Sequence, residues 1–77
     1  MRRSRVESTT VYSVGYDAKA GIVELEFRSG AVYQYLGVPA NEYRELLGAP
    51  SKGKYFNLHI RDRYPFRRLP AMNQRAV

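Results

Sequence analysis

Residues 23–35 decide the fold, and they read Val23-Glu24-Leu25-Glu26-Phe27-Arg28-Ser29-Gly30-Ala31-Val32-Tyr33-Gln34-Tyr35. In the first half, apolar and charged residues alternate, which is typical of a strand with one buried face. A turn at Gly30 separates this strand from a second run rich in β-forming residues. The stretch therefore predicts a β-hairpin.

The length of the turn decides which way two tyrosines point. A two-residue loop at 29–30 would pair Leu25 with Gln34 and turn Tyr33 toward the glutamate face. A three-residue loop instead pairs Leu25 with Tyr33. Two-residue turns favour Asn-Gly or a leading glycine, and Ser-Gly is neither. We therefore expect the longer loop, with Tyr33 and Tyr35 mainly on the core side.

The sequence on either side of the hairpin extends this pattern. Residues 11–16 are rich in β-formers and predict a strand that precedes the hairpin, joined to it by a loop over 17–21. After Gly37 the apolar period changes to three and four residues, which predicts a helix. Ala40, Tyr43 and Leu47 recur at this spacing beside Leu46, and we expect the helix to end at Gly48 and Pro50.

A second helical stretch is expected after the first. Ser51 is a suitable N-cap, and the apolar stripe includes Phe56, His59 and Ile60. Pro65 ends the stretch, and residues 66–70 are expected to continue in an extended form.

These elements predict an α+β fold: a three-stranded antiparallel β-meander with one or two short helices packed on one face. We assign residues 11–69 to a single domain, because 77 residues leave no room for a second core. Residues 1–10 lack periodicity and are expected to form a flexible basic arm, and residues 71–77 a loose tail.

Composition excludes several classes of site and location. The chain has no cysteine, so it has neither disulfides nor thiolate metal ligands. It contains no apolar run near the roughly 18 residues of a membrane span. No apolar stretch follows the basic start, as a secretory signal would require. We expect a cytoplasmic protein without metal or cofactor.

Charge is concentrated in the last third of the chain. The formal net charge is +6, and residues 51–77 carry seven lysines and arginines against Asp62 alone. Such segregation is typical of a face that binds a polyanion. The alternative is a solvated face that keeps a small domain in solution.

The motifs together resemble the KTSC domain family, a module named for its occurrence at the C-terminus of some lysyl-tRNA synthetases and also found alone in bacterial proteins. The resemblance runs from about Val6 to Leu69. It rests on these motifs: Val14-Gly15-Tyr16-Asp17, Leu25-Glu26-Phe27 with Ser29-Gly30, Tyr33-Gln34-Tyr35, Gly37-Val38-Pro39, Tyr43 with Leu46-Leu47, Ser51-Lys52-Gly53-Lys54-Tyr55-Phe56-Asn57, and Ile60 to Arg68. The association with synthetases implies RNA binding.

Cations near the C-terminus are the main candidates for phosphate contact: Lys52, Lys54, Arg61, Arg63, Arg67 and Arg68. Arginine forks match phosphate oxygens and stack on bases. The two lysines flank a glycine near a helix N-terminus, where a small phosphorylated or nucleotide ligand is an alternative. We expect Asp62 to pair with one of the arginines.

Aromatic and polar side chains give a second set of candidates for stacking or ligand contact. Tyr33 and Tyr35 could stack on bases, although the expected register favours core packing. Tyr55, Asn57 and His59 are further candidates. With no cysteine beside it, His59 does not indicate a metal site, and we expect a partly buried helix residue.

No catalytic set emerges from the sequence. Acid–base chemistry needs two titratable groups held in one pocket, whereas Glu24 and Glu26 are expected to face outward and Glu42 and Glu45 to lie on a helix surface. We therefore expect a binding module, with RNA or another polyanion as partner. The alternative is a protein-interaction module that docks an acidic surface.

Overall fold

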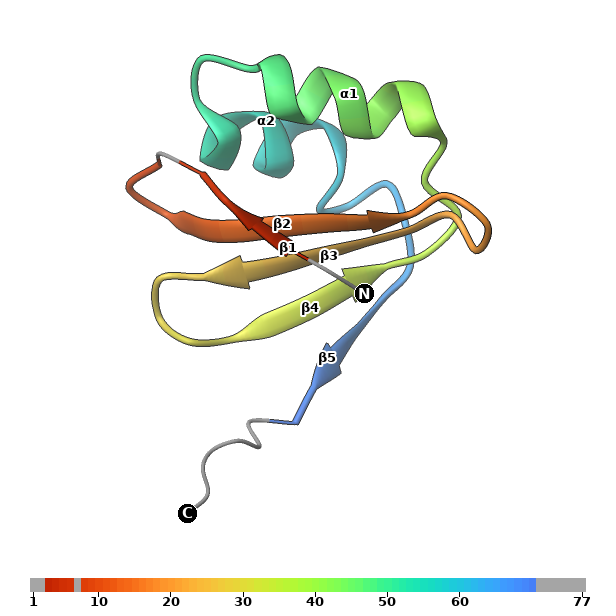
Figure 1. Ribbon diagram of the computed structural model, residues 1–77, viewed down its shortest axis with the longest axis horizontal. Coiled ribbons are helices and arrows are strands. Elements are labelled where there is room, and N and C mark those ends of the chain that lie inside the picture. Colours follow the sequence, from red (N-terminus) through yellow and green to blue (C-terminus); the bar gives the residue numbers. More distant parts are fainter. Residues whose placement is uncertain (1–2, 7, 71–77) are drawn as a thin grey trace.

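The computed structural model describes residues 3–6 and 8–70. Within them, an antiparallel sheet of five strands follows the chain order: β1 (Arg3–Arg5), β2 (Val11–Asp17), β3 (Ile22–Phe27), β4 (Val32–Tyr35) and β5 (Phe66–Leu69). Helices α1 (Ala40–Gly48) and α2 (Lys52–His59) lie between β4 and β5 in the chain and on one side of the sheet (Figure 1). The α+β class is confirmed.

The predicted meander forms the centre of the sheet, but the predicted number of strands was too low. Residues 3–5, assigned to a flexible arm, form the edge strand β1, which pairs Ser4 with Val14. The extended residues after Pro65 form the other edge strand, which pairs Phe66 with Tyr35. Neither edge segment has an apolar alternation, so its strand character depends on the neighbour that it pairs with. The predicted tail, 71–77, lies outside the described residues.

The turn between β3 and β4 has the predicted length. Leu25 pairs with Tyr33 and Val23 with Tyr35, and the Phe27 N–H donates to the Ala31 carbonyl at 2.9 Å. Gly30 has a φ of +97°, which a residue with a side chain rarely adopts. The three-residue loop is therefore confirmed, together with the face on which the tyrosines lie.

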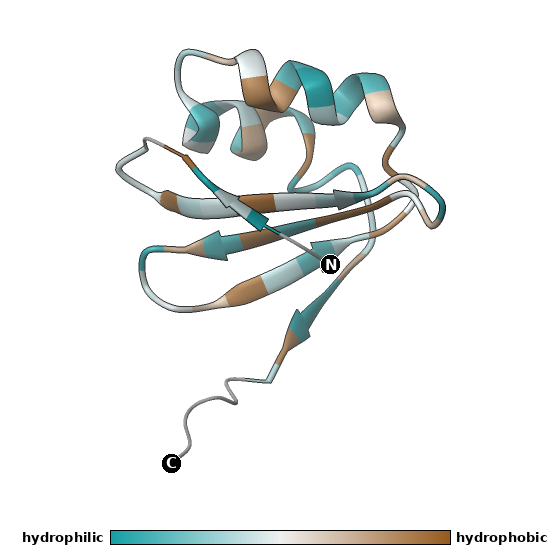
Figure 2. Cartoon of the chain, viewed as in Figure 1, coloured by the Kyte–Doolittle hydropathy of each residue, from teal (hydrophilic) through white to brown (hydrophobic). Residues whose placement is uncertain are grey.

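The core lies between the sheet and the two helices. Val14, Val23 and Leu25 of the sheet are fully buried with Leu46 of α1 and Ile60 at the end of α2. Figure 2 shows the underlying pattern as alternating hydrophilic and hydrophobic bands along β2 and β3. Of the two leucines at the end of α1, Leu46 is fully buried and Leu47 is 40% exposed, because α1 directs a single row of side chains inward.

Helix α2 begins where the sequence predicts. The Ser51 Oγ accepts a hydrogen bond from the Lys54 N–H at 3.2 Å, which makes it the N-cap. Gly53 is buried against the loop before β2, and a Cβ there would lie 3.1 Å from Thr10 Oγ1. The glycine that weakens the first turn therefore allows close approach between α2 and this loop.

Candidate functional site

A groove opens on the helix side of the sheet, where β4 and β5 meet α2. Its volume is about 490 Å³. We call it the aromatic groove and define it by its lining residues, which come from the end of β3, the β3–β4 turn, β4, α2, the turn after α2 and β5: Phe27, Ser29, Ala31, Tyr33, Tyr35, Phe56, Asn57, Arg61, Asp62 and Phe66.

Aromatic rings form the floor and one wall of the aromatic groove. Tyr35 and Phe56 are buried, with ring centroids 5.2 Å apart, and form the floor. Phe66 lies 5.5 Å from Tyr33 and 5.4 Å from Tyr35, yet it is 54% exposed. An exposed ring held against two others is a preorganised apolar platform for a planar ligand.

Two arginines lie at this platform. Arg61 lines the aromatic groove, and the Arg68 guanidinium carbon lies 5.9 Å from the Tyr33 ring centroid. The pKa of the Tyr35 hydroxyl is raised above its ordinary value, mainly by burial and then by Tyr33. The positive charge of Arg61 lowers this pKa, and the negative charge of Asp62 raises it. The charges of Arg61 and Asp62 therefore both act on the floor of the groove.

The other predicted cations do not join Arg61 and Arg68. Arg63 points to Glu42 of α1, with 3.9 Å between Nη1 and Oε1. Arg67 lies on the opposite face of the sheet, where its Nε donates to the Gln34 side chain at 2.8 Å. The set predicted as one basic surface is thus divided among separate parts of the fold.

The two lysines are also separate from the aromatic groove. The Lys52 ammonium donates to the Ala49 carbonyl at 3.0 Å, near the end of α1. Lys54 is exposed, and its backbone N–H is bonded to the cap Ser51. One of the two lysines and one backbone donor therefore already have protein partners. This turn is less suited to a phosphate than we expected from two lysines near a helix N-terminus.

Tyr55 and His59 lie away from the aromatic groove, whereas Asn57 lines it. The Tyr55 hydroxyl donates to the Glu42 carboxylate, which also accepts a bond from Tyr64 at 3.1 Å. The His59 ring lies tilted against Tyr55, with centroids 4.4 Å apart, but His59 is exposed, so the prediction of a partly buried histidine was wrong. Its place at the end of α2 turns it toward solvent. Among the described residues, no His, Cys, Asp and Glu cluster could hold a metal ion.

The outer face of the sheet carries a polar network with one or two side chains from every strand. Arg3 of β1 pairs with Glu24 and Glu26, and Ser13 donates to Glu26 at 3.0 Å. The Gln34 amide donates to Glu24 at 2.8 Å and accepts from Arg67. Glu24 faces outward as predicted but is only 6% exposed, because these partners cover it.

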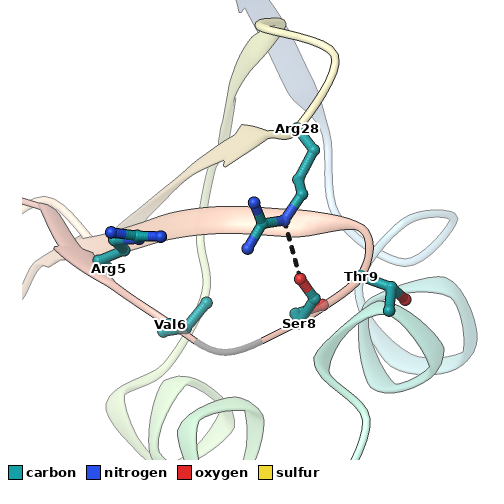
Figure 3. A pocket seen from close by; sticks show the side chains of 5 residues that line it. All are labelled: Arg5, Val6, Ser8, Thr9 and Arg28. Carbon is teal, nitrogen blue, oxygen red and sulfur yellow. Dashed lines mark hydrogen bonds between the residues drawn. The ribbon is translucent and has the colours of Figure 1, made fainter.

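A second hollow, of about 720 Å³, lies beside β1 and the loop before β2. Figure 3 shows its lining, which includes Arg5 and Arg28, neither of them a predicted site residue. The Arg28 Nε donates to the Ser8 carbonyl at 2.9 Å. The guanidinium groups of Arg5 and Arg28 lie 5.1 and 5.4 Å from the Tyr12 ring. These contacts give both arginines a structural role in holding the edge of the sheet.

Phe66 is the site residue that the sequence interpretation missed. Its signal was available in the pattern: in a strand, Phe66 and Arg68 share one face and Arg67 takes the other. The residues after Pro65 were expected to be extended, but nothing local indicated their pairing with β4. That pairing alone brings Phe66 onto Tyr33 and Tyr35.

Comparisons with known proteins agree with this fold. The model of the KTSC domain matches residues 7–64. An uncharacterized protein of Stutzerimonas stutzeri is 44% identical over 57 residues, which cover 74% of this chain and 80% of that protein. The crystal structure of a KTSC domain protein from Yersinia pestis superposes with a TM-score of 0.87 at 35% identity, covering 90% of this chain and 97% of that one.

A longer enzyme contains a similar segment. The lysine–tRNA ligase of Nostoc punctiforme is 36% identical over 63 residues, which cover 82% of this chain but only 11% of the ligase. The likeness therefore concerns one small part of that protein. In the part of the present chain that the structure describes, no helix has the length and apolar character needed to cross a membrane.

Proposed function

The chain belongs to the KTSC domain family, and from this premise we propose that it is a module that binds single-stranded RNA, rather than an enzyme, through the aromatic groove. The observation that carries the proposal is the exposed Phe66 ring, supported by Tyr33 and Tyr35 and accompanied by Arg61 and Arg68. Aromatic rings stack on unpaired bases, and arginines bind the phosphates that connect them.

The shape of the groove favours a single strand over a duplex. Its volume of about 490 Å³ lies within the range typical of sites for small ligands, and such a groove is too small for a duplex. Bases in an A-form duplex are stacked on each other, so their faces are not open to a protein ring. An unpaired nucleotide can instead place its base on Phe66 and its phosphate near Arg68.

Charge and relatives support the same partner. The net charge of +6 favours association with any polyanion. The lysine–tRNA ligase relative is, by its name, an enzyme that acts on tRNA, and the similar segment is part of it. A module of this kind would add RNA affinity to a longer protein or act alone.

The test measures the affinity of labelled single-stranded RNA by fluorescence anisotropy for the native protein and two variants. Phe66→Ala removes the platform and should weaken binding about 5- to 150-fold, the equivalent of ~1–3 kcal/mol of stacking. Leu58→Ala is the matched control, because Leu58 is 75% exposed on α2 and does not line the groove. Its affinity should equal that of the native protein.

Salt dependence gives an independent readout of the phosphate contacts. Each phosphate contact to a single strand contributes about −0.7 to the slope of log K against log salt. Arg61→Gln should therefore flatten the slope by about that amount. A folded protein that binds no RNA at about 50 mM salt would overturn the proposal. If the protein then binds an acidic partner protein, and Arg61→Gln weakens that binding, the interaction-module alternative is favoured.

A further inference from the structure

One carboxylate lies within the otherwise basic and aromatic surroundings of the groove. Asp62 lines the aromatic groove beside Arg61, in the turn that follows α2. The Ile60 and Arg61 N–H groups both donate to the Phe56 carbonyl, at 3.0 and 2.9 Å, and Ile60 is fully buried. These bonds hold the turn that carries Asp62 against the aromatic floor, and they place its exposed side chain at the rim of the groove.

Asp62 forms no ion pair within the described part of the protein. The ion pairs found there involve Arg3 and Arg63, and none involves Asp62. The expected pairing of Asp62 with a neighbouring arginine was therefore wrong, because Arg63 turns to Glu42 and Arg61 lines the groove. A carboxylate in this position repels phosphate and accepts hydrogen bonds from a ligand.

The donors and acceptors on the edge of a base that stacks on Phe66 decide whether that base can hydrogen-bond to the Asp62 carboxylate. Guanine presents two adjacent donors, N1–H and the N2 amino group, which match the two oxygens of a carboxylate. Adenine and cytosine each place an acceptor nitrogen beside their amino group. Uracil has one N–H between two carbonyl oxygens. The acceptor atoms of these three bases would face the negative charge of Asp62.

We propose that the aromatic groove is a subsite for an unpaired guanine, stacked on the exposed Phe66 ring, with Asp62 accepting hydrogen bonds from the guanine N1–H and N2 amino group. This assignment rests on the proposed RNA binding and adds a base preference to it. Asn57, exposed on the same groove, offers both a donor and an acceptor to the remaining edge of the base. Arg61 and Arg68 contact the flanking phosphates.

The test compares four labelled RNAs of roughly ten nucleotides, each an oligouridine with G, A, C or U at one central position. A single guanine per strand prevents the strands from associating through guanine tetrads. The native protein should bind the guanine strand about tenfold more tightly than the other three, as expected for one bidentate base contact. Anisotropy titrations at one fixed salt concentration give the four affinities.

Two variants with the same change of charge separate the role of Asp62 from general electrostatics. Asp62→Asn should reduce the guanine preference to about twofold or less, because one acceptor oxygen is lost, while binding of oligouridine stays equal or rises. Glu45→Gln, on the exposed surface of α1, removes the same charge and should keep the preference. Thermal melting confirms that both variants are folded.

The outcomes distinguish the base assignment from the proposed function. Equal binding of all four strands by the native protein, or a preference for another base, would overturn the guanine subsite and leave RNA binding in place. A guanine preference that survives in Asp62→Asn would overturn the role of Asp62. If the folded native protein binds none of the four strands, RNA binding itself is wrong and the subsite is wrong with it.

Discussion

Arg67 and Arg68 are neighbours in the chain but lie on opposite faces of the sheet. The Arg67 Nε donates to Gln34 at 2.8 Å on the outer face, whereas the Arg68 guanidinium carbon lies 5.9 Å from the Tyr33 ring on the groove face. β5 is a strand, so successive side chains point in opposite directions. Two residues that look equivalent in a basic sequence run therefore have different surroundings.

This difference predicts unequal effects on RNA binding. Arg68→Ala should weaken binding about tenfold, because a hydrogen bond to a charged group contributes ~1.5 kcal/mol. Arg67→Ala removes the same charge on the other face and should cost about twofold. Anisotropy titrations of both variants with the same RNA provide the measurement. Equal losses would show that the strand does not bind in the aromatic groove alone.

The core predicts a large difference between two leucines. Leu25 is fully buried in β3, and Leu58 is 75% exposed on α2. Leu25→Ala should lower the free energy of unfolding by about 2–5 kcal/mol, because it leaves a cavity in the core. Leu58→Ala should change it by about 0.5 kcal/mol or less. Urea unfolding followed by circular dichroism measures both, and similar values for the two variants would contradict the assigned faces.

The raised pKa of the Tyr55 hydroxyl predicts that the protein loses stability in alkaline solution. Burial and the hydrogen bond to Glu42 raise the pKa of its hydroxyl to about 12, above the ordinary value of 10.0. The fold thus favours the protonated tyrosine, so this contribution is complete below pH 10.0 and is lost as the pH rises toward about 12. The pKa of Tyr64 is raised by burial and by the same carboxylate, so its contribution has the same sign.

Unfolding free energies measured from neutral pH upward test this prediction. The native protein should lose stability above pH 10.0, and Tyr55→Phe should lose less over the same interval because the titrating hydroxyl is absent. At neutral pH Tyr55→Phe should be less stable by about 1 kcal/mol, the contribution of one hydrogen bond. A variant with the same alkaline profile as the native protein would show that Tyr55 does not contribute.

The contacts of β1 predict that its two arginines contribute unequally to the stability of the protein. Arg3 pairs with Glu24, whose side chain is 8% exposed, whereas Arg5 is exposed and contacts the Tyr12 ring. Arg3→Ala leaves Glu24 with one partner fewer in a covered site and should cost about 1–3 kcal/mol. Arg5→Ala should cost about 0.5 kcal/mol. If truncating residues before Val6 left stability unchanged, β1 would contribute nothing to the fold.

The central hairpin was determined by local sequence. The alternation of Val23, Leu25 and Phe27 defines the buried face of β3, and the three residues before Ala31 define the turn. Each of these features depends on residues close together in the chain, where side-chain periodicity and the freedom of a glycine act directly. For the same reason, the first helix and the cap at Ser51 could be predicted, whereas the number of helices was left at one or two.

The two edge strands and the composition of the site were decided only by the tertiary structure. Residues 3–5 and 66–69 carry no apolar alternation, and they are strands because β2 and β4 offer them unpaired backbone groups. That pairing places Phe66 on Tyr33 and Tyr35, directs Arg67 away from Arg68, and covers Glu24 with Arg3. The sequence alone determined that the C-terminal third is basic. Which of its cations share a groove depended on the register of strands far apart in the chain, since only that register sets the face on which each side chain lies.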